Sequence, residues 1–548
     1  VRARLQRPLD FLVIADHAEN LGLAPMIAEK NADLLRLDFG RKIAGLVYDG
    51  KYGDAYTLWG EGMSNRKDPL QGQEALTRSM WRRLTGAAEA FNEPGQFTAL
   101  IGYEWTSSPG GNNLHRNVIF RDGKDEADQI IPFSNYDSTD PEDLWAWMAA
   151  YEEKTGGQVL AIPHNGNLSN GLMFDDETFS GKELDRDYAE QRMRWEPVYE
   201  VTQMKGDGEA HPALAPNDEF ADYGTWDKGS FGPEPKQPNM LPREYAREAY
   251  KRGLKYEENL GANPFKFGMI GSTDSHTSLA TIEENNYFGK AAPGEPSADP
   301  DRFQETITGY LQEPGGPDVT IRHFKTLAAG LAAVWATDNT REAIWDALNR
   351  KEVYATTGTR MMVRVFAGWD FGEPEVHRPD FVKTGYLRGV PMGGDLRAAP
   401  EGKAPTFMIR ALRDVDGANL DRVQIVKGWM DGKGELYEQV YDVLCSDGRS
   451  VNKKHRCDKP VGNTVDVKTA TYANSIGDAL MMAYWQDPDF DPGQRAFYYV
   501  RVLEIPTPRW TTYDAAFFGV DLPDGVPATH QERAYTSPIW YSPATTMR

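Results

Sequence analysis

The sequence predicts an α/β protein in which a parallel barrel or layered sheet over residues 1–365 precedes a β-sandwich-like domain over residues 366–510. Three observations predict this class. The 548 residues exceed what one hydrophobic core normally organises. Strand-like runs alternate with helical stretches from Asp10 to about Thr359, as in parallel sheets. After about Phe366 the expected strands are short and separated by Gly and Asp turns, as in antiparallel sandwiches.

The first part contains four apolar runs that are typical of buried parallel strands. They are DFLVIADH (10–17), FTALIGYEW (97–105), QVLAIPHN (158–165) and FGMIGSTDSH (267–276). Helices are expected over residues 72–90, 141–155 and 242–260. The last of these has Pro242 near its start and Gly261 after its end, which is the usual punctuation of a helix.

In the second part, TFMIRALRDV, RVQIVKGWM and AFYYVRVLEI predict the strands of a sandwich. The remaining residues, 511–548, begin within the aromatic, proline-bounded segment TPRWTTYDAAFFGV (507–520). We expect this C-terminal segment to pack back on the barrel.

Each apolar run of the first part ends abruptly in a side chain that can bind a metal ion. In α/β barrels the chemistry lies where such strands end, so these side chains should form one polar cluster. Asp274 and His276 stand two apart on an extended chain and can therefore face the same site. His nitrogens and carboxylate oxygens together suit a divalent metal. The predicted ligands are His17, Glu104, His115, His164, Asp274 and His276.

A hydrolase of anionic substrates also needs cations or amide donors to stabilise developing charge. The candidates for this catalytic role are Lys205, Arg116 and Arg509. Asn113, Asn165 and Asn167 are candidates for hydrogen bonds near the metals. No G-x-S-x-G elbow, P-loop or strand-linked G-x-G-x-x-G is present, which argues against serine hydrolases, kinases and dehydrogenases.

Composition limits the partners and the compartment. The 82 acidic residues outnumber the 60 lysines and arginines and give a net charge of −22. So acidic a surface argues against binding to nucleic-acid polymers or anionic membranes. No apolar stretch approaches the roughly 20 residues of a membrane-spanning helix. Cys445 and Cys457 favour a disulfide and an oxidising compartment, although two buried thiols are the alternative.

At these residues the sequence resembles the PHP (polymerase and histidinol phosphatase) superfamily and, more closely, the domain-of-unknown-function family 3604. The matching stretches include RPLDFLVIADHAENLG, IGYEWTS, NLHRNVIF, IPHNGNLSNG and IGSTDSHT, and they extend over nearly the whole chain. The resemblance implies a distorted seven-stranded β/α barrel with up to three metals. It places the six predicted ligands on PHP metal positions, with Glu104 as a bridging carboxylate.

One part of the PHP pattern is missing. The superfamily opens with a strand that ends in an Asp-Leu-His-x-His-Thr type motif, whereas only nine residues precede Asp10 here. We expect that this first strand lies in a segment cleaved from the chain, because its loss would leave the barrel with an open edge. The alternative is an impaired metal position.

The resemblance and the predicted ligands together favour a metal-dependent phosphoesterase that cleaves small phosphate mono- or diesters with two or three divalent ions (Zn, Mn or Fe). Its expected partner is a small anionic substrate, and its expected location is periplasmic or secreted. Two alternatives stay open: a metal-dependent hydrolase of C–O or C–N bonds, and a non-catalytic metal- or ligand-binding protein with a degenerate barrel.

Overall fold

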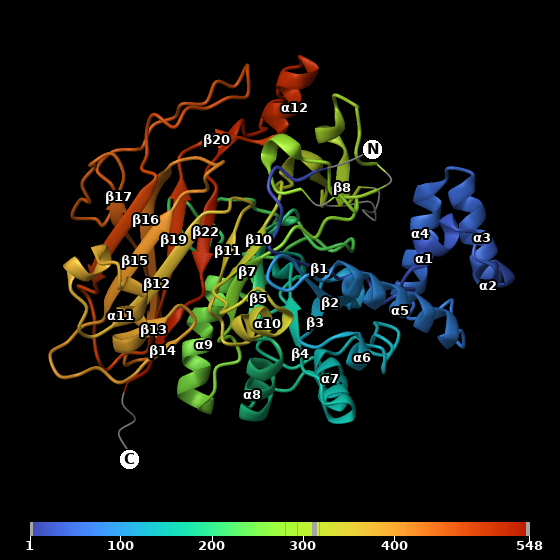
Figure 1. Ribbon diagram of the computed structural model, residues 1–548, viewed down its shortest axis with the longest axis horizontal. Coiled ribbons are helices and arrows are strands. Elements are labelled where there is room, and N and C mark those ends of the chain that lie inside the picture. The colour runs from blue at the N-terminus through green and yellow to red at the C-terminus, as the bar shows by residue number, and fades with distance from the viewer. Residues whose placement is uncertain (1–3, 280, 293, 309–314, 317, 544–548) are drawn as a thin grey trace.

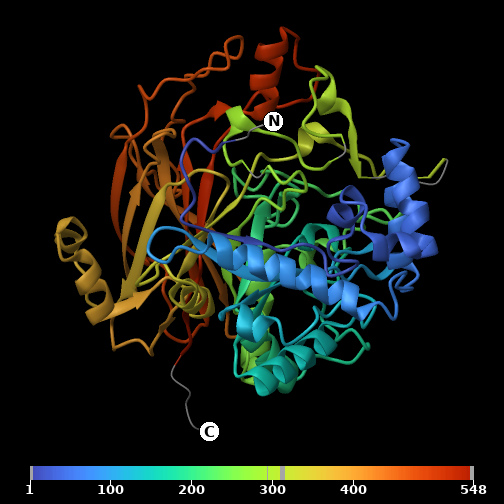
Figure 2. The ribbon, with the colours of Figure 1, turned by 45° about the vertical axis from the view of Figure 1, so that its right-hand side comes forward.

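The protein consists of an α/β half and a β-sandwich half, which lie side by side in the computed structural model (Figures 1 and 2). The structure describes residues 4–279, 281–292, 294–308, 315–316 and 318–543. Helices cover the outer side of the α/β half, and long strands dominate the other half (Figure 1).

The first sheet of the α/β half has the order β1-β2-β3-β4. Its strands are β1 (Phe11–Ile14), β2 (Thr98–Trp105), β3 (Arg116–Phe120) and β4 (Val159–Pro163). β1 and β2 are parallel as expected, but β3 runs antiparallel to both β2 and β4. The link between β2 and β3, residues 106–115, is shorter than the crossover of a dozen or more residues that a parallel connection needs. As a result, β3 starts at the edge of the sheet where β2 and β4 end.

A second sheet continues this half. β5 (Val198–Gln203) lies between β7 (Gly268–Gly271), to which it is parallel, and the short β6 (Gly206–Asp207). A parallel bridge between His164 and Glu200 joins the end of β4 to β5. The strands of the described residues do not close into a barrel, and the PHP-type barrel stays a prediction.

The helices of this half pack on the sheets through apolar faces. They are α5 (Glu74–Phe91), α6 (Lys124–Ala127), α7 (Pro141–Thr155), α8 (Arg186–Trp195), α9 (Ala246–Leu260) and α10 (Arg341–Asn349). α7 confirms the helix predicted over 141–155. Asp140 caps its first turn by accepting from the Glu142 N–H, and Gly156 ends it in the left-handed conformation. Leu144, Met148 and Tyr151 lie at helical spacing and are buried against the first sheet.

Four further helices project from the body on the side away from the sandwich (Figure 1). They are α1 (Leu23–Ala28), α2 (Ala32–Arg36), α3 (Asp38–Tyr48) and α4 (Tyr52–Ser64). α4 leads back toward the strand ends, because the ring of Trp59 lies 5.5 Å from the ring of His17.

The sandwich half contains two sheets that enclose one apolar core. The larger has the order β10 (Leu331–Val334), β11 (Val353–Thr356), β22 (Arg533–Thr536), β19 (Ala496–Glu504), β16 (Leu420–Met430) and β17 (Leu436–Cys445), with β23 (Ile539–Tyr541) on β19 and β14 (Asp395–Leu396) on β23. The smaller has the order β13 (Gly389–Pro391), β12 (Met362–Gly368), β15 (Thr406–Leu412) and β18 (Leu480–Gln486). Val365, Ile409, Ile425 and Val500 are among the buried side chains between them.

The two halves share strands across the predicted boundaries. The boundary predicted at residue 365 falls inside β12. The segment predicted to pack back on the barrel supplies β22, which lies between β11 and β19 and is therefore part of the large sheet. The short elements outside the main sheets are β8 (Thr306–Thr308), β9 (Ile321–Arg322), α11 (Phe381–Arg388), β20 (Thr507–Pro508), α12 (Trp510–Phe518) and β21 (Thr529–His530).

The predicted disulfide between Cys445 and Cys457 is confirmed, with Cα atoms 6.0 Å apart. Within the part of the chain that the structure describes, no helix combines the length and the apolar character that crossing a bilayer requires.

Candidate metal centre

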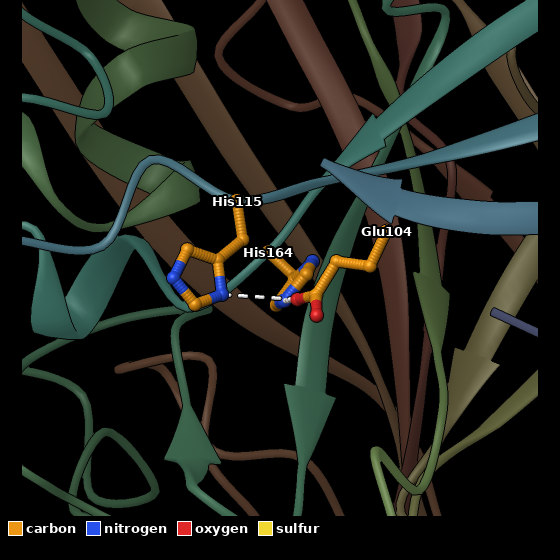
Figure 3. Close-up of side chains that lie close together, drawn as sticks. All are labelled: Glu104, His115 and His164. Atoms are coloured by element: carbon orange, nitrogen blue, oxygen red, sulfur yellow. Dashed lines mark hydrogen bonds and ion pairs between the residues drawn. The ribbon is translucent and has the colours of Figure 1, made fainter. Parts of the chain in front are cut away.

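The carboxylate of Glu104 lies at the meeting point of three imidazole rings. Its Oε1 atom is 2.9 Å from His115 Nδ1 and 2.8 Å from His164 Nε2 (Figure 3). Its Oε2 atom is 2.5 Å from His17 Nδ1. This grouping of one carboxylate and three imidazoles offers the oxygen and nitrogen donors that a divalent metal ion takes.

The topology of the first sheet explains this convergence. Glu104 stands near the end of β2, and His164 follows β4 directly. His17 follows β1 and forms a parallel bridge with Glu104. His115 precedes β3, whose reversed direction brings the start of this strand to the same edge. One edge of the sheet therefore carries all four side chains.

A second group of ligands follows β7. The Asp274 carboxylate receives Lys205 Nζ at 2.6 Å on Oδ2 and Lys290 Nζ at 2.9 Å on Oδ1. His276 Nδ1 lies 3.2 Å from the same Oδ1 atom. The rings of His276 and His17 are 5.5 Å apart, so the two groups form one centre.

The two carboxylates are ionised despite their burial. Burial alone would raise the pKa of Glu104, but the His17 and His115 imidazoles hold it well below its usual range. In the same way, Lys205 and Lys290 outweigh burial and hold the pKa of Asp274 well below its usual range. Both groups are therefore negative at neutral pH, as metal ligands must be.

Two of the imidazoles are held neutral. Burial lowers the pKa of His115 to about 4, and the Lys290 ammonium together with burial lowers that of His276 to about 3. Burial also lowers the pKa of Lys290 to about 8. Neutral imidazoles keep a free lone pair, which is the form that binds a metal.

An unsatisfied ring nitrogen is consistent with a metal at these side chains. The His164 side chain is 2% exposed, and its Nε2 atom meets the Glu104 carboxylate, whereas its Nδ1 atom makes no hydrogen bond or ion pair. Leaving such atoms unsatisfied is costly unless a ligand binds them. Glu104, His115 and His164 each direct one ligand atom into a space in which these atoms lie within 4.8 Å of one another.

A family model described as "Protein of unknown function (DUF3604)" matches residues 1–543. The chain belongs to the DUF3604 family. No curated protein matches it.

Two predicted catalytic cations of this DUF3604 protein lie outside the centre. Arg116 Nε donates to Glu196 Oε1 at 3.0 Å, and both side chains are fully buried. Arg509 donates to the Thr326 carbonyl at 2.7 Å. Each guanidinium therefore has a structural partner, and of the three predicted cations only Lys205 contacts a predicted ligand.

Three side chains of the DUF3604 centre were not predicted. Glu200, within β5, has one buried oxygen without a hydrogen bond and lies near His164 and Asp274. Its position inside the apolar run PVYEV could have predicted a role in the site, because a lone carboxylate in a buried strand needs a cation. Gln203 donates to Asp274 Oδ2 at 2.5 Å, and Lys290 contacts both Asp274 and His276. Lys290 lies in a Pro/Gly-rich loop, where the sequence carried no signal.

The three asparagines predicted near the metals form hydrogen bonds with the residues around the ligands or with a ligand itself. Asn165 accepts from Gln203 Nε2 at 3.0 Å, Asn167 donates to the Lys205 carbonyl at 3.0 Å, and Asn113 accepts from the His115 N–H at 3.1 Å. Each bond fixes the position of a residue that contacts a ligand or is one.

Proposed function

We propose that this DUF3604 protein is a metal-dependent phosphoesterase of the PHP type that hydrolyses small phosphate mono- or diesters. The observation that carries the proposal is the convergence of six predicted metal ligands from separate strand ends, with Glu104 contacting three of their imidazoles. Two ammonium groups reach the same cluster. Metal ligands beside fixed cations are the components that phosphoryl transfer requires.

His17, Glu104, His115, His164, Asp274 and His276 would hold two or three divalent ions of Zn, Mn or Fe type. Such ions would lower the pKa of a bound water and neutralise phosphoryl charge. In the hydrolysis, a water oxygen bonds to phosphorus, the ester P–O bond breaks, and the leaving oxygen takes up a proton from solvent. Lys205 and Lys290 donate hydrogen bonds to the phosphoryl oxygens as their charge grows.

The lysines favour a phosphate ester over a neutral amide or carboxylic ester. Both ammonium groups lie on Asp274, so they flank the position of a substrate bound beside that ligand. Phe231 packs 5.4 Å from Lys205 Nζ, and Trp59 packs against His17, which gives the centre aromatic walls. An acidic chain of net charge −22 suits a small substrate better than an anionic polymer.

The test is phosphate release from a panel of phosphate mono- and diesters by the purified full chain, before and after treatment with a chelator. We expect activity that the chelator abolishes and that a divalent ion restores. His164→Ala and Asp274→Ala should each lower kcat/KM by more than the roughly 100-fold that loss of a partner of a metal ligand can cause, because they remove ligands themselves. His377→Ala, at an exposed histidine far from any predicted ligand in sequence, is the matched control.

Full activity of both variants would refute the assignment of the centre. Cleavage of carboxylic esters or amides without phosphate release would favour the C–O or C–N hydrolase instead. Metal analysis with less than one ion per chain would favour the non-catalytic binding protein.

The proposed location is periplasmic or secreted. It is supported by the Cys445–Cys457 disulfide, since such bonds persist mainly in oxidising compartments.

A further inference from the structure

A second cluster of side chains that could hold a metal ion lies apart from the candidate metal centre. It consists of Glu284, His530 and Glu532, whose side chains are only 7–10% exposed. His530 Nε2 lies 3.1 Å from Glu532 Oε1 and 3.6 Å from Glu284 Oε1. One ligand atom of each residue lies within 4.8 Å of the other two.

The hydrogen bonds around the cluster leave these converging atoms free. Glu284 uses its other oxygen, Oε2, to accept from the Trp510 N–H, and its Oε1 atom is buried without a hydrogen bond. Glu532 uses Oε2 to accept from the Thr357 hydroxyl. Apart from the contacts of Nε2 with these two carboxylates, neither ring nitrogen of His530 has a hydrogen-bond partner. Outer donors that fix one carboxylate oxygen while the other faces a common point are the usual support of a metal site.

The surroundings hold the ligands in place without competing for them. The Tyr223 ring stacks on His530 with centroids 6.0 Å apart. Arg509 lies close enough to act on the charge of Glu284, but it forms no ion pair with this carboxylate and donates to the Thr326 carbonyl instead. Two carboxylates and one imidazole therefore face one another with no guanidinium between them.

We propose that Glu284, His530 and Glu532 bind one divalent transition-metal ion in addition to those of the candidate metal centre. One nitrogen and two oxygen donors suit Zn²⁺ or Mn²⁺ rather than Mg²⁺ or Ca²⁺, which prefer oxygen ligands alone. The depth of burial makes the ion a structural one.

The ion would join two segments that are distant in sequence. Glu284 stands in the loop that also carries Lys290, whereas His530 ends β21 and Glu532 directly precedes β22. The Trp510 ring of α12 packs against Tyr287 of the same loop at 4.7 Å. The second ion thus clamps the loop that presents Lys290 to Asp274.

The test is metal binding by the full chain, first stripped by a chelator and then titrated with Zn²⁺ or Mn²⁺ in a calorimeter. A Glu104→Gln/His164→Ala background disables the candidate metal centre, and we expect one site to remain. Adding His530→Gln or Glu284→Gln should weaken that site at least roughly 100-fold, the upper end of what loss of an outer-layer partner already causes.

His377→Gln in the same background is the control and should leave the remaining site unchanged. Unfolding temperatures measured in excess chelator identify any variant that fails to fold, and Glu284→Gln keeps the size of its side chain and the acceptor for Trp510. A background protein with no site, or a site that both folded variants retain at full affinity, would overturn the proposal. In that case the cluster is an ion pair of protonated His530 with its carboxylates.

Discussion

Two buried regions of this protein contain clusters of charged side chains. In one region the charges pair with one another, whereas in the other some buried polar atoms have no partner. One is the candidate metal centre around Glu104 and Asp274. The other is a junction network between the two halves, formed by Glu209, Asp218, Arg247 and Arg501.

The junction network matches every charge directly. Asp218 receives Arg247 Nη2 at 2.8 Å on Oδ2 and Arg501 Nη2 at 2.7 Å on Oδ1. Glu209 binds both guanidinium groups as well. Burial would raise the pKa of Asp218, but Arg501 and Arg247 hold it well below its usual range. Planar guanidinium groups satisfy carboxylates in pairs, so the network is complete without any ligand.

The candidate metal centre leaves atoms unmatched. His164 and Glu200 each keep buried polar atoms without a hydrogen bond, and the cations present are two lysines with flexible stems. A structural charge cluster and a binding site therefore differ in whether their buried polar atoms have partners within the chain. A completed network stabilises the fold, whereas an incomplete one of equal burial is arranged for something that the chain itself does not supply.

The largest expected effect is on the junction network. Asp218→Asn leaves two buried guanidinium groups with one carboxylate fewer, and should lower the free energy of unfolding by about 3–5 kcal/mol. Urea unfolding of the full chain measures this loss. Metal content per folded chain should not change, and a loss of bound metal without a loss of stability would contradict the distinction between the regions.

The next effect is on the candidate metal centre. Lys205→Met removes a cation that acts on developing charge, so kcat/KM for a phosphate ester should fall roughly 10²–10³-fold, or about 2.7–4 kcal/mol. Steady-state kinetics and urea unfolding are measured on the same preparation. Stability should stay close to that of the parent protein, and the reverse pattern would make Lys205 a member of a structural network.

Removing the metal should lower the thermal stability of the protein through the candidate metal centre, and not through the junction network. Ions that bind only the folded chain should stabilise it by about 2.7 kcal/mol when present at roughly 100 times their dissociation constant. Differential scanning calorimetry should therefore show a lower Tm after chelation for the parent protein and for Asp218→Asn. His164→Ala should show a smaller shift, and an equal shift would remove His164 from the ligand set.

The smallest effect, taken per pH unit, concerns a buried carboxyl group that belongs to neither region. Glu504 is buried, accepts a hydrogen bond from the Thr359 hydroxyl at 2.6 Å, and burial raises its pKa from 4.5 to about 8. Between these two pKa values, Glu504 keeps its proton in the folded state and loses it in the unfolded chain. The free energy of unfolding should fall between about pH 4.5 and pH 8, by at most about 1.4 kcal/mol per pH unit.

Glu504→Gln should remove this slope and gain stability over the parent protein as the pH rises. Urea unfolding of both proteins at pH 5, 6, 7 and 8 measures the difference. Parallel pH profiles would show that Glu504 is already ionised in the folded protein.

The sequence predicts those ligands of the site that lie at the ends of strands. Glu104 and His164 end apolar runs, and the edge of a sheet brings such ends together whatever their separation along the chain. His115 precedes its strand, and its place depends on the reversal of β3, which the short link after β2 imposes. Lys290 could not be found, because the position of a loop depends on long-range packing that no local pattern encodes.

For the fold, the sequence predicts the types of the elements but not how distant strands pair. Element types followed local patterns, as in the capped helix α7. The large sheet was not readable, since its order joins β11, β22 and β19 from three distant parts of the chain. Arg116 shows the same limit for a single side chain. Its sequence neighbour His115 suggested the site, but its partner Glu196 lies on another element.

The position of β22 has a consequence for how the protein is made. β11 and β19 are joined in the large sheet through this strand, which follows both of them along the chain. Until it arrives, each of them exposes an unpaired edge that can join another chain. Folding of the large sheet must therefore wait until β22 has been synthesised, and a nascent or truncated chain that stops before Arg533 should depend on chaperones to avoid aggregation.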